Sequence, residues 1–160
     1  MKQFFIFFLL ATPFVAMSQA HSGYTASYSS NFTMADPSYS EKILTLWKDF
    51  ENNTLDNHAD MFADTVTMML TDGTMVKGKA ENLSGAKQFR GSVKNYKAAL
   101  DAWVSLKSTD RNQNVVCVWG TESYTDKDGK TVKTRLQEVW GFNKDGKIDL
   151  LIQYSAPGSM

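Results

Sequence analysis

The chain has 160 residues, which is enough for one domain with a proper hydrophobic core. Its 17 basic and 17 acidic residues balance, so we expect no nucleic-acid partner and no anionic membrane surface as a partner. The single cysteine, Cys117, excludes an intramolecular disulfide. The sequence holds no Cys/His cluster with metal spacing, no glycine-rich phosphate loop and no nucleophile elbow. We therefore predict neither a metal nor any other cofactor.

Residues 1–20 have the pattern of a secretory signal peptide. Lys2 is followed by a mostly apolar run over residues 4–16, and then by the small-x-small site Ser18-Gln19-Ala20. A membrane anchor is the alternative, but the run of about 13 residues is shorter than the ~20 that a spanning helix needs. We expect cleavage after Ala20, a secreted or periplasmic protein, and no membrane association after cleavage.

Three helices and a hairpin are predicted in the first part of the remaining chain. Residues 21–37 are rich in Ser and Tyr and show no periodicity, so we expect a flexible N-terminal arm. From Ser38, apolar residues recur at i, i+3, i+4 and i+7, which is typical of an amphipathic helix. These residues are Ile43, Leu46, Trp47 and Phe50. A short helix over 55–64, a hairpin around Asp72-Gly73 and a helix over 79–97 are expected next.

The last four predicted elements are strands, over 100–107, over 115–124, and as a pair over 131–156 with a turn at 144–146. In this pair Glu138 falls on the same face as Leu136 and Trp140, so a carboxylate points toward an apolar face. A three-residue loop is expected to place Glu138 opposite Ile152.

The parity of the turn at 126–129 decides which face of the preceding strand meets Glu138. We expect a turn of two or four residues there. Either length places Cys117, Trp119 and Thr121 on the Glu138 face, and Glu122, a weaker second acid, on the opposite face.

The order of elements predicts an α+β fold, α-α-β-β-α-β-β-β-β. Helices that pack on one face of a curved, mostly antiparallel sheet enclose a cone-shaped cavity. Two stretches are informative beyond this order, MFADTVTMMLTDGTMVKGKAENL over 61–83 and EVWGFNKDGKI over 138–148. Through them the chain resembles the SnoaL-like branch of the nuclear transport factor 2-like superfamily over residues 38–155, which implies a cystatin-like cone.

The resemblance implies a role for a few individual positions. Glu138 falls where isomerases and cyclases of this superfamily often keep a pocket acid. The position of the isomerase general base is Leu70, and that of its tyrosine donor is Leu46. An apolar side chain neither takes nor gives a proton, so steroid isomerisation is disfavoured. Asp72 is near in sequence, but a hairpin turn favours Asp for backbone reasons alone.

Two functions from different classes follow. The first is an exported module for binding or association, whose apolar cone either holds a small apolar or aromatic ligand or is closed. The second is a small isomerase, lyase or cyclase that uses Glu138 as catalytic acid or base without a cofactor. We favour the first, because only His58 offers a base near Glu138, and a helix-surface histidine is the commoner reading. The predicted pocket-lining residues are Trp47, Phe50, Phe62, Leu70, Trp119, Trp140, Ile152 and Tyr154.

A homodimer through the open face of the sheet is also expected. In this reading the face away from the helices carries Trp103, Val139 and Leu151, which is too apolar for a broad surface in water. Members of the resembled superfamily commonly pair in this way.

Overall fold

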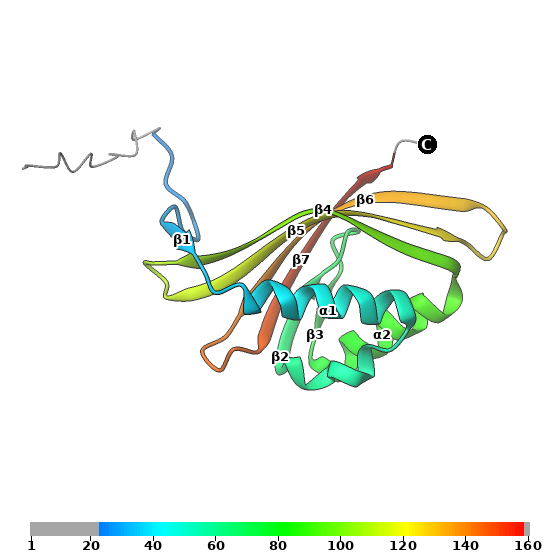
Figure 1. Ribbon diagram of the computed structural model, residues 1–160, viewed down its shortest axis with the longest axis horizontal. Helices are drawn as coiled ribbons and strands as arrows, with labels where there is room; N and C mark the ends of the chain where they lie inside the picture. Colours follow the sequence, from blue (N-terminus) through cyan, green and yellow to red (C-terminus); the bar gives the residue numbers. More distant parts are fainter. Residues whose placement is uncertain (1–22, 159–160) are drawn as a thin grey trace, which may run out of the picture.

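The computed structural model describes residues 23–158. α1 (Ser38–Asn52), η1 (Leu55–Met61) and α2 (Lys79–Ser92) pack on one side of a curved seven-stranded sheet, as Figure 1 shows. The predicted α+β class, with helices on one face of a curved sheet, is confirmed. The predicted signal peptide lies outside the described residues. No helix in the described part of the chain is long and apolar enough to cross a membrane.

The sheet has the strand order β1-β4-β5-β6-β7-β2-β3. All neighbours are antiparallel except β2 and β7, which run parallel. The strands are β1 (Phe32–Met34), β2 (Phe62–Met69), β3 (Met75–Lys77), β4 (Lys94–Ser108), β5 (Gln113–Thr125), β6 (Thr131–Phe142) and β7 (Ile148–Pro157). The long strands β4 to β7 form the curved wall over which α1 lies (Figure 1).

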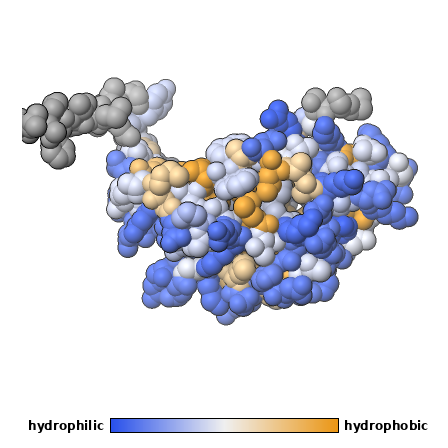
Figure 2. Space-filling model, viewed as in Figure 1, coloured by the Kyte–Doolittle hydropathy of each residue, from blue (hydrophilic) through white to orange (hydrophobic). Residues whose placement is uncertain are grey.

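One core lies between the helices and the concave side of the sheet. The apolar stripe of α1 faces inward, and Ile43 and Leu46 are almost fully buried. Burial of each such side chain stabilises the fold by about 1.5–3 kcal/mol. The outer surface of the helix layer is mostly hydrophilic (Figure 2). The core comprises Ile43, Leu46, Trp47, Phe62, Val66, Met68, Val116, Val118, Leu136, Trp140, Phe142, Ile148 and Leu151.

Two expected boundaries differ from the structure. Residues 32–34 of the expected N-terminal arm form β1, where Phe32 pairs with Ser108 at the edge of the sheet. The helix expected over 79–97 ends at Ser92, and β4 starts at Lys94. Gly91 weakens the end of that helix, and pairing with β5 stabilises the extended alternative for the residues that follow.

Asp126 and Lys130 extend the pairing of β5 with β6, so residues 127–129 form an odd loop and the expected parity of β5 is wrong. Asp126 N–H donates to the Lys130 carbonyl at 2.9 Å, and Gly129, in the left-handed region at φ +79°, closes the turn. An odd loop places Val118, not Cys117, opposite Glu138. Glu122 therefore lies on the helix side of the sheet.

A β-bulge changes the predicted register of the last hairpin. Phe142 pairs with Ile148, as predicted, but Gly141 already pairs with Leu150, and Asp149 is the extra residue. Beyond the bulge every side chain of β7 changes face. Gln153, not Ile152, therefore lies opposite Glu138.

Candidate functional site

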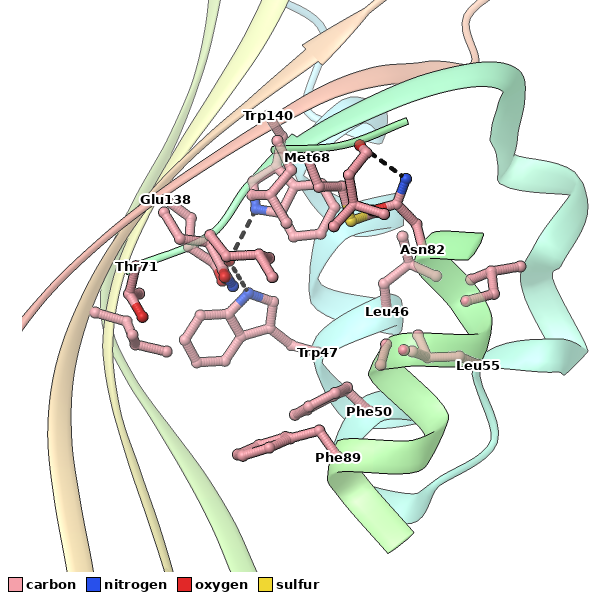
Figure 3. A pocket seen from close by; sticks show the side chains of 18 of the residues that line it. Leu46, Trp47, Phe50, Leu55, Met68, Thr71, Asn82, Phe89, Glu138 and Trp140 are labelled. Carbon is pink, nitrogen blue, oxygen red and sulfur yellow. Dashed lines mark hydrogen bonds between the residues drawn. The ribbon is translucent and has the colours of Figure 1, made fainter. Parts of the chain in front are cut away.

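A cavity of about 430 Å³ lies between the sheet and the helix layer. Most of its wall is apolar and comes from α1, η1, α2 and the concave side of the sheet (Figure 3). The apolar lining is Leu46, Trp47, Phe50, Leu55, Phe62, Met68, Leu70, Val76, Leu83, Gly85, Ala86, Phe89, Leu136, Trp140 and Leu151. The polar lining is Thr71, Asp72, Glu81, Asn82, Tyr96, Glu122, Glu138 and Gln153. A cavity of this size and character is typical of a small-molecule site.

Glu138 is held on the wall of the cavity by three N–H donors. Its side chain is buried, with 3% of the residue exposed. The indole N–H groups of Trp47 and Trp140 donate to its Oε2 at 2.7 and 2.9 Å, and Figure 3 shows both bonds. The amide of Gln153 donates to Oε1 at 2.8 Å. A carboxylate has about four acceptor positions, so three are occupied.

Burial raises the pKa of Glu138, because a charged carboxylate is poorly solvated inside the protein. The hydrogen bonds from Gln153, Trp47 and Trp140 act in the opposite direction, since each favours the ionised form. Gln153 suits both forms, because its NH₂ donates to a carboxylate and its carbonyl accepts from a carboxylic acid.

Trp47 reaches Glu138 because β5 has no side chain at Gly120. A Cβ at Gly120 would lie 2.8 Å from Cη2 of Trp47 and 2.7 Å from the carbonyl oxygen of Ala99. The indole therefore rests on the backbone of β5 and points its N–H toward β6. This glycine determines the position of one of the three donors to Glu138.

A second carboxyl group, Glu122, also lines the cavity. The hydroxyl of Tyr96 donates to its Oε2 at 2.9 Å. Burial is the largest cause of the raised pKa of both groups. The proximity of Glu122 adds to the shift for Tyr96 and, as a smaller effect, for Glu138. Sequence reasoning placed Glu122 on the wrong face and assigned no role to Tyr96.

The mouth of the cavity lies between α2 and the β2–β3 turn, where the exposed lining residues are found. Thr74 N–H donates to Asp72 at 2.8 Å and holds the pKa of this carboxyl below its usual range. Asn82 is buried and donates to the carbonyls of Val66, Val76 and Gly78, so it joins α2 to both strands of the hairpin.

The structure brings together many of the residues that the sequence singled out and separates the others. Trp47, Phe50, Phe62, Leu70, Trp140 and Glu138 all line the cavity. Leu46, at the position of the tyrosine donor, lines it as well.

Trp119, Ile152 and Tyr154 were predicted to line the cavity, and this is wrong. The odd loop moves Trp119, and the bulge moves Ile152 and Tyr154, to the outer face of the sheet. There Trp119 and Tyr154 flank a separate shallow hollow of about 220 Å³.

His58 takes no part in the cavity lining. Its Nδ1 lies 2.5 Å from Oδ2 of Asp49, a buried residue of α1. The hydroxyl of Thr54 donates to the other oxygen of Asp49 at 3.0 Å. This cluster joins the end of α1 to η1, which is a structural role.

Comparisons with known proteins give similarity in structure alone. No family model matches the sequence, and no curated protein matches it. Among solved structures, an NTF2-like protein of unknown function from Burkholderia pseudomallei aligns at 16% identity and a TM-score of 0.61, over 74% of this chain and 90% of that chain. An NTF2-like protein of unknown function from Cytophaga hutchinsonii aligns at 18% identity and a TM-score of 0.52, over 72% of this chain and 97% of that chain. An LEH-like epoxide hydrolase from M. tuberculosis aligns at 13% identity and a TM-score of 0.61, over 74% of this chain and 82% of that chain.

These likenesses show the fold of the chain. The chain has the nuclear transport factor 2-like fold, as the resemblance predicted. Proteins of this fold include both enzymes and proteins of unknown function, so the fold alone does not choose between the two functions above.

Proposed function

We propose that this chain is a small-molecule-binding module whose conical cavity takes an apolar or aromatic ligand. The observation that carries the proposal is the cavity of about 430 Å³ with a mainly apolar wall and a mouth beside α2. Burial of a ligand against such a wall is favourable at roughly 25 cal/mol for each Å² of apolar surface. The few polar groups on the wall are fixed in place and give specificity.

The alternative, an isomerase or lyase that uses Glu138, has weaker support. Three N–H groups, from Trp47, Trp140 and Gln153, already donate to Glu138. Leu70 and Leu46 stand at the positions of the isomerase base and tyrosine donor, and His58 lies outside the lining. Proton transfer needs a partner of suitable pKa within hydrogen-bond reach of the substrate. The geometry around Glu138 supports the role of a structural hydrogen-bond acceptor better than that of a catalytic acid.

The test is binding of N-phenyl-1-naphthylamine, an uncharged dye whose emission rises in apolar surroundings. Ala86 lines the cavity from α2, whereas Ala80 is exposed on the same helix outside the lining. Ala86→Phe is expected to weaken dye binding at least about tenfold, a loss of ~1.4 kcal/mol. Ala80→Phe is the matched control and is expected to leave binding unchanged. Equal binding by both variants places the dye elsewhere and removes support for the cavity.

We also propose a homodimer through the outer face of the sheet, with a corrected set of residues. Trp103 pairs with Val118 and Leu151 lines the cavity, so both lie on the helix side, contrary to expectation. Val139 stays on the outer face, and the loop parity and the bulge add Trp119 and Tyr154, which are 36% and 56% exposed. Sedimentation at micromolar concentration tests the proposal. A Tyr154→Glu variant should dissociate, and a wild-type monomer contradicts it.

Export is proposed on the sequence pattern of residues 1–20. The intact mass of the chain recovered from its source is expected to correspond to a first residue at His21. A chain that still begins at Met1 contradicts export by this route.

A further inference from the structure

The carboxyl groups on the cavity wall have no basic counterpart there. Four lining residues carry a carboxyl group, and within residues 23–158 no Lys, Arg or His lines the cavity. Asp72 and Glu81 lie at the mouth, whereas Glu122 and Glu138 lie inside. The chain as a whole carries no net charge, so this asymmetry belongs to the cavity. A cleft lined by one sign of charge attracts ligands of the other sign and repels its own.

The wall around Glu122 is aromatic. Tyr96, which donates to Glu122, packs against Phe50 edge to face at 5.2 Å between ring centroids. Phe50 in turn stacks on Phe89 at 6.3 Å, and all three rings line the cavity. Aromatic rings attract cations through their negative faces by about 0.5–2 kcal/mol, more where water is excluded. A carboxylate beside aromatic rings is the combination that recognises ammonium groups.

Glu122 has no cationic partner among the described residues. The hydroxyl of Tyr96 is its one donor, and Glu122 forms no ion pair. The guanidinium of Arg90 lies over the Tyr96 ring, 5.0 Å from its centroid, and donates to the Glu51 carbonyl at 2.7 and 3.0 Å. Arg90 does not line the cavity. Glu138 differs, because three donors already hold it. Glu122 is therefore the group on which a ligand's charge can act.

Resting on the proposed function, we infer that the ligand class of this cavity is an apolar organic cation, a protonated amine or a quaternary ammonium. Its nitrogen lies against Glu122 and the aromatic part of the wall, and its apolar body extends along Trp47. An anion of the same shape meets carboxylates with no basic group to balance them, so the cavity rejects it.

Three ligands of one shape separate this inference from the proposed function. They are 2-naphthylmethylammonium, the uncharged 2-naphthalenemethanol and the anionic 2-naphthoate, each titrated into the chain by calorimetry at neutral pH. The ammonium is expected to bind at least about tenfold more tightly than the alcohol, which corresponds to ~1.4 kcal/mol. The carboxylate is expected to bind more weakly than either.

Two variants locate the effect. Glu122→Gln keeps an acceptor for the Tyr96 hydroxyl and is expected to bring the ammonium within about threefold of the alcohol, roughly 0.7 kcal/mol. The affinity of the alcohol should change less than that of the ammonium, because the alcohol carries no charge for Glu122 to attract. Glu41→Gln removes the same charge from the exposed face of α1 and is expected to preserve the tenfold preference.

The possible results of these titrations have different consequences for the cation inference and for the proposed function. If the alcohol binds as tightly as the ammonium, the cavity binds ligands but the cation inference is overturned. If none of the three ligands binds, the proposed function itself fails. A preference for the ammonium that survives in a folded Glu122→Gln variant places the cation elsewhere and also overturns the inference. The three-ligand comparison on the wild-type chain needs no variant, so it holds even if Glu122→Gln does not fold.

Discussion

Replacement of Glu138 by Gln and by Leu separates a structural acceptor from a charged one. Gln keeps an oxygen for the two indole N–H groups, and its NH₂ can donate to the Gln153 carbonyl once that amide turns over. Leu removes every acceptor and leaves the buried indoles of Trp47 and Trp140 unpaired. An unsatisfied buried donor costs about 1–3 kcal/mol, so Glu138→Leu should lower the free energy of unfolding by roughly 2–6 kcal/mol.

The Gln variant should also change how stability depends on pH. Burial raises the pKa of Glu138 in the folded state, so the folded chain binds this proton more tightly than the unfolded chain. Stability from this group is fully present below the ordinary Glu pKa and is lost as pH rises through the raised pKa. The loss amounts to about 1.36 kcal/mol for each factor of ten by which the folded chain binds this proton more tightly than the unfolded chain. The Glu138→Gln variant lacks this loss, so its free energy of unfolding should rise relative to that of the wild type as pH rises.

Urea unfolding followed by far-ultraviolet circular dichroism between pH 4 and 8 measures both effects. Glu41→Leu, on the exposed side of α1, is the control and should stay within about 0.5 kcal/mol of the wild type. The reasoning is refuted if Leu and Gln at position 138 cost the same. A free-energy difference between Glu138→Gln and the wild type that does not vary with pH refutes the raised pKa.

Four further substitutions test the rest of the site. Gly120→Ala forces Trp47 away from Glu138 and should cost about 2–4 kcal/mol in urea unfolding, from overpacking and one lost hydrogen bond. Gly85→Ala in α2 is the matched control, because a Cβ there meets nothing within 4 Å, and it should be neutral or stabilise the fold by up to ~1 kcal/mol. Equal costs at Gly85 and Gly120 contradict the proposed role of Gly120 in placing Trp47. Asn82→Leu removes the side-chain amide that links α2 to the hairpin, although the Val66 and Gly78 carbonyls keep a backbone N–H donor. It should lower the free energy of unfolding by roughly 1–3 kcal/mol, and a loss below ~0.5 kcal/mol excludes this role. Tyr96→Phe removes the hydroxyl donor that favours the ionised form of Glu122, so the pKa of Glu122 should rise further in an NMR titration. An unchanged pKa of Glu122 contradicts the hydrogen bond from Tyr96.

Much of the fold is predictable because local periodicity and burial agree in it. The helical spacing of Leu46 and Trp47 on α1 predicts the inward stripe that the structure shows. The alternation around Glu138 predicts that this carboxylate enters an apolar space. The end of α2 was not predictable from the helical pattern, because Val93 and Tyr96 fit a helix equally well. Pairing of β4 with β5, a contact distant in sequence, decides their conformation.

The error at β5 comes from one loop, and the sequence contains the signal that corrects it. Asp126 and Asn143 each precede the same four residues, Lys-Asp-Gly-Lys. In both loops the side chain of the first residue accepts two backbone N–H groups, and the glycine lies in the left-handed region. A three-residue loop was expected for the second copy alone. A three-residue loop after Asp126 would likewise have predicted that Glu122 faces the cavity and that Trp119 faces away from it.

The error at β7 has a different origin, because no local pattern marks the bulge at Asp149. A bulge forms where tertiary contacts favour it, and here Gly141 leaves room for Leu150, whose Cβ lies 3.1 Å from the position that a Cβ at Gly141 would take. Oδ1 of Asp149 is buried without a hydrogen-bond partner among the described residues, and burial raises the pKa of this carboxyl. Local chemistry therefore opposes the bulge, whereas packing favours it, since Leu151 enters the core. The same shift turns Gln153 toward Glu138, so the third donor to that carboxylate depends on packing that only the folded chain contains.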